Sequence, residues 1–98
     1  MSLEQTDLGN GLTFNRLSLR VATIKQGKQR LASYFGFRTK RDAQKFIKAV
    51  SHRALWKGYE LRPAKRLDDW CNWEVKAWGC PTAFIAAMAD RDGQPESA

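Results

Sequence analysis

The spacing of apolar residues changes abruptly near Thr39, and this change limits the possible folds more than any other feature of the chain. Before it, "RLASYFGFR" (residues 30–38) alternates in steps of two, which is typical of a β-strand with two different faces. After it, four apolar residues recur in steps of three and four, as on one side of an α-helix: Ala43, Phe46, Ile47 and Val50. The Thr-x-x-Asp pattern at Thr39 resembles a helix cap. We therefore predict a strand that leads into a helix over about residues 40–53.

The spacing of apolar residues in the rest of the chain predicts further strands and a second helix. Residues 16–25 and 70–78 alternate in steps of two, and a strand near residues 59–65 contains Pro63, which favours an edge position. "QGKQ" (residues 26–29) predicts a turn, and "GCPT" (residues 79–82) begins a helix that ends by Gly93. The expected order is ββαββα. It predicts an α+β fold with a mostly antiparallel four-stranded sheet and two helices packed on one face.

The composition at the two ends predicts the domain organisation. Residues 1–13 are expected to form a flexible arm, residues 14–90 a single α+β domain, and residues 91–98 a disordered tail. Within the domain, two ββα units are expected at about residues 16–53 and 58–90. Leu-Arg-x-Ala occurs at Leu19 and again at Leu61, which indicates an internal duplication or the same packing solution reached twice.

Positive charge is concentrated in the middle of the chain. Residues 16–66 contain 15 Lys or Arg and two Asp or Glu, a balance of +13, within a net charge of +7. The other residues contain two Lys or Arg and eight Asp or Glu, a balance of −6. Such an uneven distribution attracts polyanions and favours a nucleic-acid partner. A well-solvated basic surface that keeps the protein soluble is the alternative.

The alternation of the strands places arginines and an aromatic ring on the sheet face that the helices leave uncovered. Guanidinium groups bind phosphate or guanine, and rings stack on unpaired bases. The candidate nucleic-acid-binding residues come from this face, the turns and the first helix: Arg16, Arg20, Lys28, Arg30, Tyr34, Arg38, Lys40, Arg41, Lys45, Arg62, Lys65 and Arg66. Either the sheet face or the helix face could carry the polyanion, and we favour the sheet. A register shift of one residue would exchange the faces.

Trp70 and Trp78 are candidates for a second kind of contact. The chain contains four tryptophans, and this residue is common in protein interfaces as well as in stacking sites. Base stacking, a protein interface and ordinary partial burial all stay open for these two residues.

A β-hairpin followed by "FGFRTKRDAQKFI" (residues 35–47) resembles the AP2-like, arm-type DNA-binding domains at the N-terminus of many phage integrases. The resemblance covers about residues 16–50. In that family the sheet enters the major groove, so the resemblance implies the following DNA-reading residues: Arg16, Arg20, Arg30, Tyr34 and Arg38. The second ββα unit departs from the family pattern and no recombinase catalytic domain follows, so recombination itself is not implied.

The sequence carries no recognisable catalytic or metal-binding pattern. Cys71 and Cys80 are nine residues apart and the single histidine, His52, is far from both, so no disulfide framework or zinc site is expected. The pair Asp68 and Asp69 is more simply a turn than a metal site. No enzyme activity and no cofactor are therefore expected. The chain has no secretory signal and no apolar run near 18 residues, so we expect a cytoplasmic protein without a membrane partner.

Two functions remain as hypotheses. The first is a small, basic, non-enzymatic nucleic-acid-binding protein, with DNA or RNA as its partner. The second is a small protein-interaction adaptor or inhibitor, for example of a nucleic-acid-handling complex, that uses a tryptophan-rich surface. A homodimer is compatible with either hypothesis.

Overall fold

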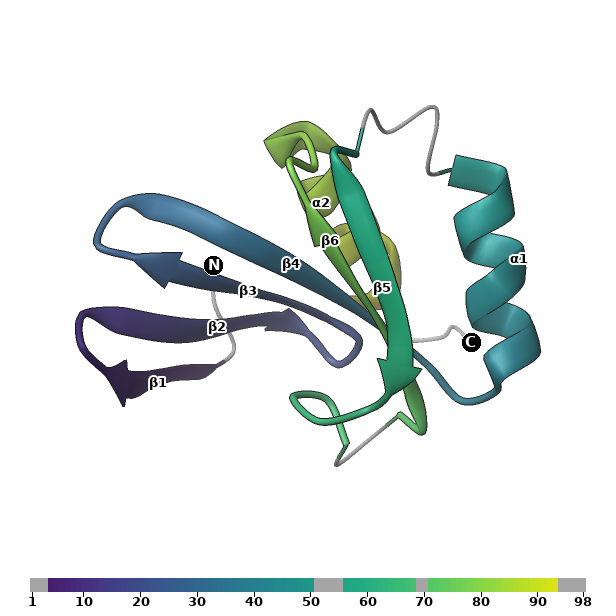
Figure 1. Ribbon diagram of the computed structural model, residues 1–98, viewed down its shortest axis with the longest axis horizontal. Helices are drawn as coiled ribbons and strands as arrows, with labels where there is room; N and C mark the ends of the chain where they lie inside the picture. Colours follow the sequence, from purple (N-terminus) through teal and green to yellow (C-terminus); the bar gives the residue numbers. More distant parts are fainter. Residues whose placement is uncertain (1–3, 51–55, 69–70, 94–98) are drawn as a thin grey trace.

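The computed structural model describes residues 4–50, 56–68 and 71–93. It has an α+β fold, with one antiparallel sheet and two helices on the same side of it (Figure 1). The elements in chain order are β1 (Glu4–Gly9), β2 (Leu12–Ser18), β3 (Val21–Gln26), β4 (Gln29–Phe37), α1 (Lys40–Val50), β5 (Gly58–Pro63), β6 (Trp73–Trp78) and α2 (Thr82–Gly93). The strand order is β1-β2-β3-β4-β6-β5, so β5 is an edge strand, as Pro63 predicts. Neither described helix is long and apolar enough to cross a membrane.

The main core lies between the sheet and both helices. Phe35 of β4 and Val75 of β6 are fully buried, and they pack in one cluster with Ala43 and Ile47 of α1 and with Ile85 of α2. Helix α1 contacts β4 and β6, whereas α2 contacts β2 and β3. The predicted apolar stripe of α1 and the position of both helices on one face are therefore confirmed. Residues 51–53, which were expected to extend α1, lie outside the described residues.

The segment predicted as one strand over residues 16–25 is in fact two strands. β2 ends at Ser18 and β3 begins at Val21, and Leu19 is 46% exposed in the turn between them rather than in the core. The buried guanidinium of Arg16 supports this turn: its Nε donates to the Ser18 carbonyl at 3.3 Å and its Nη2 to the Leu19 carbonyl at 2.7 Å. The turn contains no Gly, Pro, Asn or Asp, so the sequence gives no local signal for it.

The expected N-terminal arm is also part of the sheet. Residues 4–13 form β1 and the start of β2, and their turn consists of Gly9, Asn10 and Gly11, all with positive φ (88°, 56° and 78°). Apolar side chains hold this hairpin in place, because Leu8 and Leu12 pack against a second core cluster. The sheet therefore has six strands instead of the four that we predicted. At the other end, residues 91–93 belong to α2 rather than to a tail, and residues 94–98 lie outside the described residues.

The sheet face opposite the helices is covered over its centre, although we expected it to be open. Leu67 and Cys71 of the β5–β6 connection pack there against Tyr34 and neighbouring apolar residues of β2–β4. Gly36 permits this close approach, because a Cβ at this position would overlap Cys71 Sγ and lie 3.2 Å from Leu67 Cδ1. The β5–β6 connection therefore forms a small second core on this face.

Candidate nucleic-acid interface

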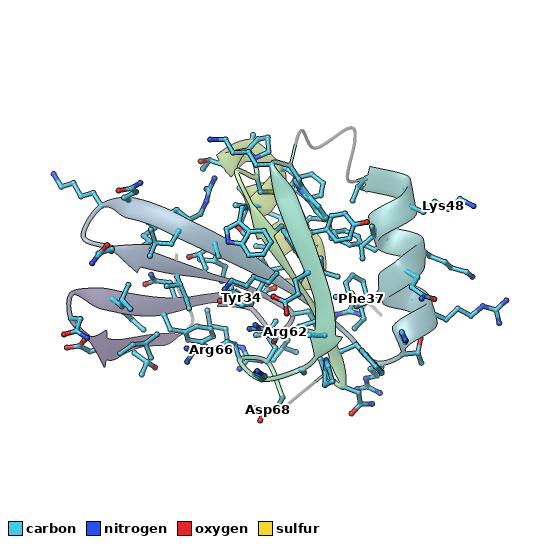
Figure 2. All side chains as sticks on the ribbon, in the orientation of Figure 1. Tyr34, Phe37, Lys48, Arg62, Arg66 and Asp68 are labelled. Carbon is cyan, nitrogen blue, oxygen red and sulfur yellow. The ribbon has the colours of Figure 1, made fainter. Side chains whose placement is uncertain are left out.

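Helix α1 turns one side to the core and the other to solvent. Its exposed side carries four cations, which together form what we call the basic face of α1: Lys40, Arg41, Lys45 and Lys48. With 3.6 residues per turn, these four side chains lie within an arc of about 140°. Figure 2 shows Lys48 extending from the helix away from the sheet. The helix begins where Thr39 Oγ1 accepts a hydrogen bond from the Asp42 N–H at 3.1 Å, as its capping pattern predicts.

The charge of this face is not neutralised within the described part of the chain. No carboxylate of the described residues lies within ion-pair distance of Arg41, Lys45 or Lys48, and Asp42 is the only acid on α1. The Lys40 ammonium lies 5.3 Å from the centroid of the Trp73 ring, a cation–π contact that leaves its charge in place. The basic face of α1 is therefore a compact source of positive potential.

Two residues predicted on an open sheet face are buried instead. Arg16 is 6% exposed and Tyr34 is 2% exposed, because the β5–β6 connection and the β2–β3 turn take up their side chains. Burial raises the pKa of the Tyr34 phenol above its ordinary value, although the charge of Arg62 works against this shift. Neither side chain is available for stacking or for phosphate contact in this structure.

Arg62 shares this buried environment. Its guanidinium lies 5.6 Å from the centroid of the Tyr34 ring (Figure 2). Its Nε donates to Glu74 Oε2 at 2.7 Å. Burial opposes the charged form of Arg62, but the hydrogen bond and the charge of Glu74 outweigh burial and raise its pKa. The Arg62 guanidinium therefore stabilises the fold through its pair with Glu74, and the Arg62 side chain is only 16% exposed.

Arg30 lies on the helix side of the sheet, opposite to its predicted face. A register shift in the β3–β4 pairing between Ile24 and Lys25 places Leu31 outside the regular alternation, so that Lys25 pairs with Arg30. The Arg30 guanidinium donates to Thr82 Oγ1 at 3.1 Å and to the Cys80 carbonyl. Arg30 therefore joins β4 to the beginning of α2.

The other predicted cations are spread over the molecule rather than gathered at one site. Arg20 is half-buried in the β2–β3 turn, and Arg38 is exposed just before α1. Lys28 is exposed in the β3–β4 turn, at the end of the sheet remote from α1 (Figure 1), and Lys65 and Arg66 are exposed in the β5–β6 connection. Of the twelve candidates, Lys40, Arg41 and Lys45 form the largest group on one exposed helix surface, with Arg38 adjacent to them in sequence, and Lys65 and Arg66 form a separate exposed pair.

The described tryptophans are half-buried. Trp78 packs against the second core, with the Lys76 ammonium 5.4 Å from its ring centroid. Trp56 and Trp73 pack against the main core. Trp70, the other stacking candidate, lies outside the described residues.

Lys48 and Tyr59, which are not among the predicted site residues, line a groove between α1 and β5. The groove has a volume of about 440 Å³ and is lined by Gln44, Ile47, Lys48, Tyr59 and Leu61. Tyr59 is 48% exposed, more than any other described aromatic residue. Two signals in the sequence could have identified this site: Lys48 shares the helix face of Lys45, and Tyr59 shares the strand face of Leu61.

The thiols and acids of the described residues do not form a metal-binding cluster. No group of three His, Cys, Asp or Glu lies close enough to hold a metal ion among residues 4–50, 56–68 and 71–93. Burial raises the pKa of the Cys80 thiol, against the opposing effects of the Trp56 Nε1–H, which donates to Sγ at 3.0 Å, and of the Arg30 charge. A thiol with a raised pKa is a poor nucleophile. His52 and Asp69 lie outside the described residues.

No family model, no curated protein and no solved structure matches the chain. The resemblance of residues 16–50 to AP2-like domains therefore stays a prediction.

Proposed function

We propose that this protein is a small, non-enzymatic nucleic-acid-binding protein that holds the phosphate backbone on the basic face of α1. The observation that carries the proposal is the grouping of four exposed cations on one side of a single helix, with no carboxylate of the described residues paired to three of them. This proposal moves the expected interface from the sheet to the helix, because Arg16 and Tyr34 are buried.

The dimensions of the face suit a polyphosphate. Arg41 and Lys48 are seven residues apart, which corresponds to about 10 Å along a helix that rises about 1.5 Å per residue. One nucleic-acid strand places a phosphate about every 3.4 Å along the duplex axis, so this length matches about three phosphates. Lys and Arg that neutralise phosphates release counterions, and this release provides most of the affinity in non-specific binding. We expect dissociation constants of about 10⁻⁴ to 10⁻⁶ M at physiological salt.

The proposal also includes the cytoplasm as the site of action. Cys71 and Cys80 are both free thiols. Free thiols are common in reducing compartments, whereas small secreted domains commonly use paired cysteines.

A protein partner remains the alternative, but it has less support. Its motivation was a tryptophan-rich surface, and the three described tryptophans are half-buried and packed against the two cores. The basic face of α1 carries no aromatic residue, and interfaces between proteins favour aromatic anchors over lysines.

Fluorescence anisotropy with labelled single-stranded DNA, duplex DNA and single-stranded RNA tests the proposal. The test variant combines Arg41→Gln, Lys45→Gln and Lys48→Gln, three exposed positions whose side chains make no hydrogen bond or ion pair with the described residues. The matched control combines Lys28→Gln, Lys65→Gln and Arg66→Gln, which remove the same charge from other surfaces. We expect the first variant to weaken binding at least about tenfold and the control to weaken it much less. Equal losses, or no binding by the unmodified protein, would overturn the proposal.

A further inference from the structure

We propose that the groove between α1 and β5 holds one unpaired base of a single-stranded nucleic acid, stacked on Tyr59. This inference rests on the proposed function and adds a ligand class to it: single-stranded rather than fully paired nucleic acid. The site joins the basic face of α1 through Lys48, which belongs to both.

The groove is open and large enough for a base. Its volume of about 440 Å³ lies within the range of roughly 300–1,000 Å³ that is common for small-molecule sites. Ile47 of α1 and Leu61 of β5 provide its apolar lining, and Tyr59 provides a ring of which about half is exposed. A purine or pyrimidine has two apolar faces, so an aromatic ring beside aliphatic side chains suits it.

The Tyr59 ring is held in place by its neighbour. The Trp56 ring lies edge-on to it, with centroids 5.9 Å apart and an interplanar angle of 62°. Trp56 in turn stacks on the buried Phe35 ring at 5.9 Å and 8°. A ring supported in this way from the core loses little conformational freedom when a base stacks on it, which favours binding.

The polar groups of the groove match the rest of a nucleotide. Gln44 offers an amide that can both donate to and accept from a base edge. Among the described residues that line the groove, Lys48 alone is charged, so a neighbouring phosphate meets a cation there. The nearby acid Glu60 points its carboxylate elsewhere, since its Oε1 lies 3.8 Å from Arg62 Nη1 on the opposite face of β5.

The same geometry selects against a paired base. In a duplex both faces of each base are covered by stacked neighbours, so Tyr59 could stack only on a base that is unpaired or turned out of the helix. The cations at Arg41 and Lys45 continue the basic face beyond the groove and can contact the adjacent phosphates of the same strand. Single strands therefore gain the stacking contact, whereas duplexes gain the phosphate contacts alone.

The test measures anisotropy for a labelled single-stranded decamer and for its duplex with the unmodified protein, Tyr59→Ala and Tyr59→Phe. We expect Tyr59→Ala to weaken single-strand binding by about tenfold or more, in line with the known effect of removing one stacking residue, and to leave duplex binding unchanged. Tyr59→Phe keeps the ring and should bind as the unmodified protein does. Circular dichroism of Tyr59→Ala checks that it is folded.

A second measurement does not depend on any substitution. Irradiation of the unmodified protein with a single-stranded oligonucleotide that carries 5-iodouracil, followed by peptide mapping, should place the cross-link at Tyr59. If Tyr59→Ala binds both ligands normally and the cross-link lies elsewhere, the inference is overturned. Loss of binding in the Arg41, Lys45 and Lys48 triple variant under those same conditions would still support the proposed function, so the two failures can be told apart.

Discussion

The Glu74 carboxylate in β6 lies 2.7 Å from Arg62 Nε in β5, and it is fully buried. Its other oxygen accepts hydrogen bonds from three successive backbone N–H groups, those of Lys65, Arg66 and Leu67, at 3.2, 3.1 and 3.4 Å. This carboxylate therefore fixes the β5–β6 connection over the sheet, which covers Tyr34 and removes that face from the candidate interface.

Substitution of Glu74 should destabilise the fold strongly. Glu74→Gln leaves the largely buried Arg62 guanidinium with only the exposed Glu60 carboxylate, at 3.8 Å, as a counterion, and it replaces one acceptor oxygen by an amide. Breaking a buried ion pair by removing one partner costs about 3–5 kcal/mol, and the oxygen that glutamine retains should reduce this to about 2–4 kcal/mol. Urea denaturation followed by tryptophan fluorescence measures the change in the free energy of unfolding.

Glu60→Gln is the matched control for this prediction. The Glu60 side chain is 52% exposed and its carboxylate lies 3.8 Å from the same guanidinium. Exposed ion pairs contribute about 0–1 kcal/mol, so this substitution should change stability by less than about 1 kcal/mol. Similar losses in the two variants would show that Glu74 does not hold the connection.

Gly36 should tolerate no side chain, because the β5–β6 connection passes directly over it. Gly36→Ala would bring a Cβ into Cys71 Sγ and to within 3.0 Å of Cys71 Cβ. Overpacking of this kind costs about 1–3 kcal/mol. Thermal denaturation of Gly36→Ala, alone and combined with Cys71→Ala, measures the cost, which should be partly relieved in the double variant.

Gly58→Ala provides the comparison for Gly36. A Cβ added at Gly58 would have Trp78 Cε3 as its nearest atom, at 3.4 Å, apart from the residues next to it in sequence. This distance is an ordinary van der Waals contact. Alanine in a strand also loses less backbone entropy on folding than glycine does. We expect Gly58→Ala to be neutral or slightly stabilising, and an equal loss at both glycines would contradict the packing described for Gly36.

Stability should fall at alkaline pH. Burial raises the pKa of the Cys80 thiol and of the Tyr34 phenol above their ordinary values of 9.0 and 10.0. Both groups bind their proton more tightly in the folded state than in the unfolded state. Their contribution to the free energy of unfolding is therefore complete below pH 9.0, and it is lost as pH rises above the pKa that each group has in the unfolded chain. Each group can contribute a slope of at most about 1.4 kcal/mol per pH unit.

Urea denaturation at several pH values from neutral upward measures this fall. Cys80→Ala should be less stable overall, because it loses the contact with Trp56 Nε1, but its stability should decline less steeply just above pH 9.0. In Tyr34→Phe, the free energy of unfolding should fall less steeply with pH than in the unmodified protein only as pH passes 10.0. Unchanged slopes in both variants would show that these two groups are not the origin of the alkaline sensitivity.

Helix α1 could be predicted because its sequence and its packing agree. Thr39 caps it, Ala43 and Ile47 face the core, and the lysines remain outside, so local propensity and tertiary structure favour the same element. The alternation of β4 and β6 was equally informative. Phe35 and Val75 lie on the helix side and Tyr34 lies on the other side, as the alternation in steps of two requires.

The β1–β2 turn does carry a local signal, Gly9-Asn10-Gly11, whereas other parts of the fold depend on contacts that no local pattern reveals. The Leu19–Arg20 turn is held by the Arg16 side chain, and the position of Arg30 depends on a register shift in the β3–β4 pairing. The sequence correctly indicated that Tyr34 faces away from the helices, but it could not indicate that Leu67 would cover it. The candidate site moved to α1 for this reason.

The salt dependence of binding tests the central claim most directly. The logarithm of the association constant for single-stranded DNA should fall linearly with the logarithm of salt concentration between about 50 and 200 mM. If Arg41, Lys45 and Lys48 each neutralise one phosphate, substituting all three by glutamine should reduce the magnitude of the slope by about 2, at roughly 0.7 per phosphate. The control triple variant at Lys28, Lys65 and Arg66 should keep the slope of the unmodified protein. An unchanged slope for the α1 variant would contradict the assignment of the basic face of α1 as the phosphate-binding surface.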